Sequence, residues 1–262
     1  MLTLGGAAAA AADASDGLYG AKTILTGQEE PNRSVGIAKC LKYVLVKVTG
    51  DPRLVDDPRV PTVVADARTF VLDFHYRDLM EGIPIHDEQG TRERPYELTV
   101  TFDPAKINAA VRSLGSEPWV GPRPLVVIFV AVRNGTATYT LASDGSRGRD
   151  QRDALVAAAD RFGMPMTLPS QATLSHVGLT FDTLPTADLS DLAKTATAAG
   201  GDLALAGTLD WSDEALGWVA EWRFSFAGTA HRWRVSGVNF DDAFRSGVGA
   251  AAQILSGHGS PD

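Results

Sequence analysis

The best candidate for chemistry in the sequence is a charged loop in the first half of the chain. Two acids beside a histidine can hold a divalent cation, or serve as general acid and base. The loop residues are Asp78, Glu81, His86, Asp87 and Glu88, with Arg92 and Arg94 nearby. A solvated loop of mixed charge explains the pattern equally well, because loops carry both function and most surface charge. The loop is therefore a candidate polar site, and a metal-dependent hydrolase centred on it is the least favoured function.

An aromatic stripe near the C-terminus is the second candidate. Trp218 and Trp222 fall on one side of a strand, and Trp233 lies on the next strand. Such a face can stack on sugars or anchor a protein partner. At a spacing of two residues beside a terminal helix, sheet core is the more common position. The three tryptophans are thus a candidate ligand or partner face, with core packing as the alternative.

The motifs that usually identify an enzyme are missing from the sequence. It contains no G-x-x-x-x-G-K-[ST] motif and no G-x-G-x-x-G motif after a strand, the two glycine-rich motifs that bind phosphate groups. It also contains no G-x-S-x-G nucleophile elbow. No histidine stands three to five positions from another, which excludes a helical zinc pair. Cys40 is the only cysteine, so neither an intrachain disulfide nor a thiolate metal cluster can form. We expect no catalytic residue, no metal and no cofactor.

The composition is that of an acidic globular protein. Of the 262 residues, 44% are hydrophobic and 21% are charged, close to the globular average, so the chain can build a packed core. The net charge is −8 and no basic stripe is present. We therefore expect no binding to nucleic acid, which requires Lys and Arg to neutralise phosphates.

The first 16 residues resemble the end of a secretory signal. An alanine run over residues 7–12 leads to small residues around Ala14. This stretch is too short to span a bilayer, which takes about 20 apolar residues, and we expect no transmembrane segment elsewhere. A basic start is missing, so an alanine-rich N-terminus of a cytoplasmic protein is the alternative. The expectation is a periplasmic or otherwise exported protein.

Periodicity predicts a first domain over residues 17–116. Apolar residues recur on one helical face from Ile37 to Val48, and then alternate with period two around Phe74 and again around Val100. The predicted elements are a strand (18–26), a helix (31–50), a short helix (60–68), two strands (70–76 and 96–102) and a helix ending at 115. A Pro-rich linker over residues 117–124 follows.

A second domain is predicted over residues 125–256, with a frayed tail at 257–262. An unbroken apolar run opens it, and Asn134-Gly135 is a strong hairpin signal. The predicted elements are strands at 125–132, 136–141 and 164–168, helices ending at 162 and 196, strands at 203–209, 218–226 and 230–235, and a helix at 241–255. Residues 170–186 are predicted to be a loop. The fold class is α/β (α+β): two small domains, each a mixed or antiparallel sheet with helices packed on it.

Five segments in order resemble the bacterial family of unknown function DUF2066. They are residues 45–51, 74–77, 98–103, 119–125 and 206–209. The resemblance spans about residues 18–255 and implies an envelope protein with no established activity. The second half also resembles the TolB amino-terminal domain and CsgG-like lipoproteins, a likeness of fold that does not transfer function.

These observations favour a non-enzymatic accessory or assembly protein of the envelope that acts through contacts with envelope proteins. The alternative is a binding module for a small molecule or cell-wall glycan. The sequence leaves the partner, the ligand and the oligomeric state open.

Overall fold

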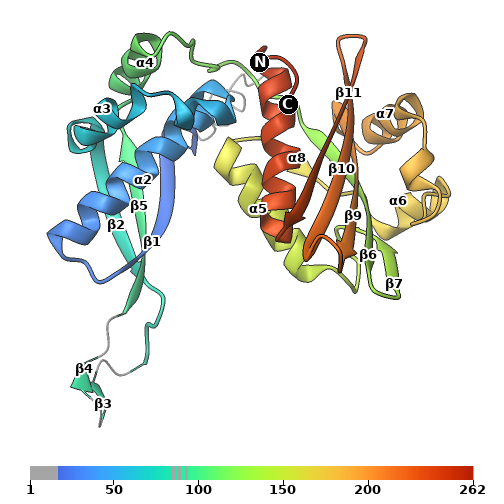
Figure 1. Ribbon diagram of the computed structural model, residues 1–262, viewed down its shortest axis with the longest axis horizontal. Coiled ribbons are helices and arrows are strands. Elements are labelled where there is room, and N and C mark those ends of the chain that lie inside the picture. Colours follow the sequence, from blue (N-terminus) through green and yellow to red (C-terminus); the bar gives the residue numbers. More distant parts are fainter. Residues whose placement is uncertain (1–16, 84–85, 88–89, 92–93, 262) are drawn as a thin grey trace, which may run out of the picture. The chain divides into compact units, whose positions relative to one another are not determined.

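The computed structural model describes residues 17–83, 86–87, 90–91 and 94–261. The chain divides into two units, Met1–Val120 and Gly121–Asp262 (Figure 1). Both are mixed α+β structures in which helices pack on a sheet, so the predicted fold class is confirmed. No helix within the described ranges combines the length and the apolar character needed to cross a membrane.

The first unit is built on a three-stranded antiparallel sheet. Its strands are β1 (Gly20–Thr26), β2 (Val71–Asp78) and β5 (Pro95–Phe102), in the order β1-β5-β2. Its helical segments are α2 (Glu30–Thr49), η1 (Pro52–Asp56), α3 (Val60–Ala65), η2 (Ala67–Phe70) and α4 (Pro104–Ser113). The predicted strands and helices of this half are present, with η2 in place of the end of the short helix.

The core of the first unit lies between α2 and the inner face of the sheet. Ile37, Leu41, Val44 and Val48 are buried, as their helical spacing predicts. They belong to one cluster with Leu98, Val100 and Phe102 of β5, which supply every second residue of that strand. The helix ends where Gly50 takes a left-handed conformation with φ 74°, which glycine adopts without steric cost.

The second unit is built on a six-stranded mixed sheet. Its strands are β6 (Val126–Asn134), β7 (Ala137–Thr140), β8 (Met166–Thr167), β9 (Leu203–Ser212), β10 (Gly217–Phe226) and β11 (Thr229–Val238). The order is β11-β10-β9-β6-β7, with β8 beside β6. Strand β6 runs parallel to β8 and β9, and the other pairs are antiparallel.

Helices cover both faces of this second sheet (Figure 1). One face carries α5 (Arg149–Phe162) and α8 (Phe240–Leu255), which pack against each other, and α8 also packs on the meander of β9 to β11. The other carries α6 (Gln171–His176), η3 (Leu184–Thr186) and α7 (Leu189–Ala198). Strand β6 is buried on both sides, so its sequence is an unbroken apolar run.

Two segments differ from the prediction. Residues 170–186, predicted to be a loop, contain α6 and η3, because helices of one or two turns are too short to show a full hydrophobic period. Between β2 and β5 the chain forms a small hairpin of β3 (His86–Asp87) and β4 (Gly90–Thr91). Residues 1–16, which carry the signal-like stretch, lie outside the described residues.

Candidate functional site

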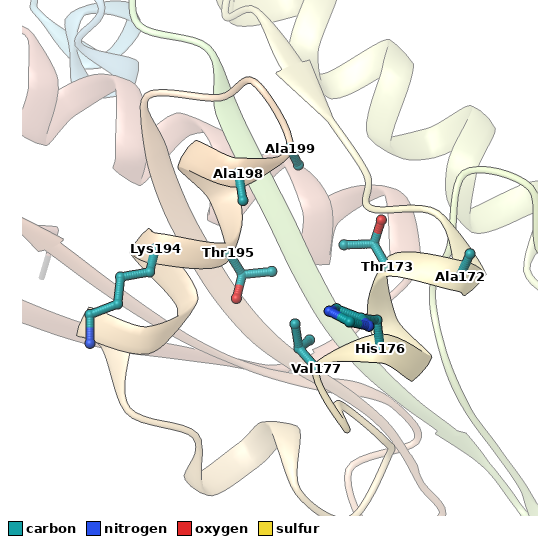
Figure 2. Close-up of a pocket in the computed structure, with 8 residues that line it drawn as sticks. All are labelled: Ala172, Thr173, His176, Val177, Lys194, Thr195, Ala198 and Ala199. Atoms are coloured by element: carbon teal, nitrogen blue, oxygen red, sulfur yellow. The ribbon is translucent and has the colours of Figure 1, made fainter.

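A groove between α6 and α7 forms an open hollow on the second unit (Figure 2). Its volume is about 560 Å³, within the usual range for ligand pockets. Figure 2 shows His176, Val177 and Thr195 facing this space, whereas the Lys194 side chain points away from it. The lining residues are Ala172, Thr173, His176, Val177, Lys194, Thr195, Ala198 and Ala199.

Capping and core contacts fix the two helices that form the groove. Ser170 caps α6 by accepting a hydrogen bond from the Thr173 backbone N–H at 3.1 Å, and Asp188 caps α7 by accepting from Ser190 N–H at 2.7 Å. On the side facing the sheet, Leu174 and Leu192 are buried in the core beneath the helices. The remaining faces of both helices are therefore turned to solvent and to each other.

Arg223 of β10 holds the segment that leads into α7. Its guanidinium donates to the carbonyl oxygens of Leu184 and Ala187, both at 2.9 Å. Burial lowers the pKa of this guanidinium, and the neighbouring Arg232 lowers it further. Arg223 thus anchors the loop beside the groove.

A second hollow of about 260 Å³ adjoins the first and shares Val177 and Thr195 with it. Asp188 and Asp191 lie in its wall, whereas His176 and Lys194 line the first hollow. We call the two hollows together the α6/α7 groove. Its floor is made of small and apolar side chains, and Lys194, Asp188 and Asp191 are the charged groups in its wall.

An ion pair joins two of these charged groups. Lys194 Nζ lies 2.8 Å from Asp191 Oδ1, and both side chains are exposed. The hydrogen bond from Lys194 to Asp191 raises the pKa of the Lys194 ammonium. Hydrogen bonds from Ser190 lower the pKa of Asp188, and the Lys194 charge adds to this effect. All of these groups are solvated, so the pair is weak and a ligand can compete for it.

The groove hydroxyls are held in local hydrogen bonds. Thr195 Oγ1 donates to the Asp191 carbonyl at 3.0 Å, and Thr173 Oγ1 lies 2.9 Å from Ser170 Oγ. Among the described contacts, His176 makes no hydrogen bond to either threonine. A nucleophile needs an adjacent base that is itself oriented. The arrangement therefore offers groups for binding and no activated nucleophile.

Of the charged-loop residues, the structure describes the side chains of Asp78, Glu81 and Arg94. Asp78, at the end of β2, accepts from Met80 N–H at 2.8 Å and pairs with Arg94 at 2.9 Å. Glu81 is exposed in the following turn, and Asp87 pairs with Gly90 in the small hairpin. Glu88 lies outside the described residues, and His86 begins β3. No group of three or more His, Cys, Asp or Glu side chains within the described ranges could hold a metal ion.

Arg94 anchors this loop. The sequence does not indicate this role, because Arg94 stands among other charged residues. Its side chain is only 6% exposed. Besides the pair with Asp78, its guanidinium donates to the Ile83 carbonyl at 2.7 Å and to the Met80 carbonyl. A buried arginine with several acceptors closes the base of the loop, which is a structural role.

The tryptophan stripe is part of the core. Trp222 is fully buried, and Trp218 and Trp233 are each 6% exposed. The reason is a close fit between β9, β10 and α8, in which Gly207 and Gly247 leave room for the Trp222 ring. No face of these three rings is open for a ligand to stack on, which corrects the expectation of an aromatic binding surface.

Cys40 is also structural. It is fully buried in α2, and desolvation raises the pKa of its thiol to about 12. The thiol is therefore protonated and unreactive at neutral pH.

Fold and site together define a two-unit α+β protein with a surface groove. Residues 11–120 match the model of a domain of unknown function, DUF8605, which covers the first unit and less than half of the chain. The resemblance to DUF2066 is therefore wrong, since the matching family is a different one. No curated protein matches the chain. The groove lies in the second unit, outside the matched residues.

Proposed function

We propose that the chain is a non-enzymatic binding protein whose second unit takes up a segment of a partner protein in the α6/α7 groove. The observation that supports this proposal is the groove itself: two adjoining hollows lined largely by small and apolar side chains. The hydroxyls in it are committed to local hydrogen bonds. The groove therefore offers a ligand its shape, an apolar floor and an exposed ion pair that a charged ligand can displace.

The open form of the groove favours an extended ligand. Pockets for small molecules bury most of the ligand surface, but most side chains in this wall are exposed, Val177 to 43%. A peptide can run along the groove and place an acidic side chain near Lys194 and a basic one near Asp188. Recognition by such charged groups contributes more to specificity than to affinity.

A matched pair of substitutions on α7 tests this function. Ala198→Trp fills the groove, whereas Ala193→Trp places the same ring on an exposed position of the same helix outside the lining. Each tagged protein is used for affinity capture from cells that make it naturally. We expect a set of proteins recovered by wild type and Ala193→Trp and lost with Ala198→Trp. Equal recovery by all three proteins would refute the proposal.

The alternative ligand is a small molecule or glycan, which the volume of about 560 Å³ can hold. Thermal unfolding in the presence of nucleotides and glycans distinguishes the two ligand classes. If one of these compounds stabilises wild type and Ala193→Trp but not Ala198→Trp, that compound, and not a peptide, is the ligand of the groove.

A role as an accessory or assembly protein of the envelope is part of the proposal. It is supported by the alanine-rich stretch over residues 7–12, typical of an exported protein. Fractionation of the native cells, with mass spectrometry of the mature N-terminus, tests it. Recovery of the protein in the cytoplasm alone, with residues 1–16 intact, would contradict it.

A further inference from the structure

Strand β2 is an edge of the three-stranded sheet in the first unit. Among the described residues, the order β1-β5-β2 leaves one side of β2 without a neighbouring strand (Figure 1). The side chains of Asp73, Phe74, His75 and Arg77 are all exposed along it. An edge strand presents a row of backbone N–H and C=O groups with which another strand can pair.

The backbone groups of Phe74 and Tyr76 point to the free side of β2. In an antiparallel ladder, hydrogen-bonded and non-hydrogen-bonded pairs alternate along the strand. Leu79 N–H donates to the Pro95 carbonyl at 3.1 Å, so the register places the odd-numbered residues of 73–77 in hydrogen-bonded pairs with β5. The even-numbered positions therefore supply the donors and acceptors of the free edge.

The charges of β2 are arranged symmetrically about His75. Asp73 lies two residues before it and Arg77 two residues after it, and all three lie on the face of the sheet that is turned away from the core. If a second β2 pairs in the antiparallel sense about a two-fold axis at His75, Asp73 of each copy faces Arg77 of the other. The same register brings Phe74 opposite Tyr76, in the hydrogen-bonded pairs that their free backbone groups require. Charge and backbone therefore select one register.

The outer face of the sheet has charge left over for such a partner. Arg77 lies 3.2 Å from Glu97, but Glu97 also pairs with Lys22 at 3.7 Å, so two cations share one acid. No ion pair of Asp73 is present among the described residues. A second copy would bring its Asp73 to this excess of positive charge.

The other edge strand, β1, lacks this complementarity. Lys22 is its only charged residue, so a two-fold pairing of β1 would meet no acid.

We propose that two copies of the chain pair edge to edge through β2, antiparallel and centred on His75. Backbone hydrogen bonds between Phe74 and Tyr76 and ion pairs between Asp73 and Arg77 hold the copies together. Each copy uses the same surface, so the contact closes as a two-fold dimer and does not grow further. The contact is small, so association requires a high protein concentration. This surface lies in the first unit, and the inference is independent of the α6/α7 groove.

Sedimentation velocity of the full chain over a micromolar to millimolar range tests the charge pairing. We expect wild type to pass from monomer to dimer and no further. Asp73→Lys and Arg77→Glu each place like charges opposite one another and should raise the dissociation constant of the dimer at least about tenfold. Lys42→Glu, which reverses an exposed charge on α2, is the control and should dimerise like wild type.

Mixing the two charge-reversal variants is the decisive step. Across the two-fold axis each variant supplies the charge that the other lacks, so an equimolar mixture should form one-to-one heterodimers. This recovery also shows that both variants are folded. A mixture that stays monomeric while wild type dimerises would overturn the inference. A wild type that is monomeric at all concentrations would do so as well, as would variants that dimerise as strongly as wild type.

Disulfide cross-linking tests the register. The two-fold axis places residue 75 opposite its own copy in a non-hydrogen-bonded pair, with a Cα separation of about 4.5 Å that a disulfide can bridge. Mild oxidation of His75→Cys should therefore give a covalent dimer, and Lys22→Cys, on the exposed face of β1, should not. The native Cys40 is fully buried and does not interfere. Equal cross-linking of the two variants, or none in His75→Cys, would overturn the inference.

Discussion

Replacement of Gly247 by alanine should destabilise the second unit, although alanine is the better helix former. Gly247 lies in α8 against the buried Trp222 ring, where an added Cβ would come within 2.5 Å of Trp222 Cε2. The ring cannot retreat, because a Cβ on Gly207, on its other side, would also lie 2.5 Å from it. Overpacking of this kind costs about 3 kcal/mol, and the gain in helix propensity is about 1 kcal/mol. The expected net loss is about 2 kcal/mol of unfolding free energy.

Urea unfolding followed by far-ultraviolet circular dichroism measures this loss. Ser246→Ala, on the adjacent position of the same helix, is the control and should change stability by no more than about 0.5 kcal/mol. In a Trp222→Phe background the clash is removed, so Gly247→Ala should there be neutral or stabilising. If Gly247→Ala is as stable as wild type in the native background, the close fit of Trp222 between the two glycines is refuted.

Three further predictions concern the first unit. Arg94→Ala should cost about 3 kcal/mol in urea unfolding, because it leaves Asp78 and two carbonyls without their buried donor. The control is Arg77→Ala, which removes an ion pair with Glu97 made by a 65% exposed arginine side chain, and it should cost less than about 1 kcal/mol of unfolding free energy. Equal losses in Arg94→Ala and Arg77→Ala would contradict the anchoring role of Arg94. The Cys40 thiol, with a pKa of about 12, should react with a disulfide reagent at neutral pH only after unfolding, and rapid labelling of the native protein would disprove its burial. Hydrogen bonds from Arg59 lower the pKa of Asp57 to about 2, so its contribution to stability is complete above its ordinary value of 3.8 and is lost as the pH falls through about 2. Nuclear magnetic resonance titration should return this carboxyl toward its ordinary pKa in Arg59→Ala, and an unchanged midpoint would contradict the assignment.

Much of the fold follows from periodicity. The helix around Leu41, the alternating strand around Val100 and the hairpin at Asn134-Gly135 are present as predicted. In each case one face of a regular element is buried, so the hydrophobic pattern has the period of the element. The sequence does not determine whether the tryptophans are buried or exposed, because a period of two shows only that Trp218 and Trp222 share a face of the strand. Gly207 and Gly247, far apart in sequence, leave the room that buries Trp222.

The groove could not be predicted from its residues. Its wall is made of alanines, threonines and single charges such as His176 and Lys194, which individually are typical of any exposed helix. The only local signals were the capping residues Ser170 and Asp188, which mark the starts of α6 and α7. The hollow exists because two short helices stand side by side on a sheet, and that arrangement is set by long-range packing.

Hydrogen–deuterium exchange of the full chain, with and without a captured partner, tests the central claim most directly. If the α6/α7 groove is the docking site, exchange should slow at the amides of Gln171–His176 and Leu189–Ala198 in wild type, with no such protection in Ala198→Trp. Protection confined to the three-stranded sheet of the first unit, with α6 and α7 unchanged, would contradict the account.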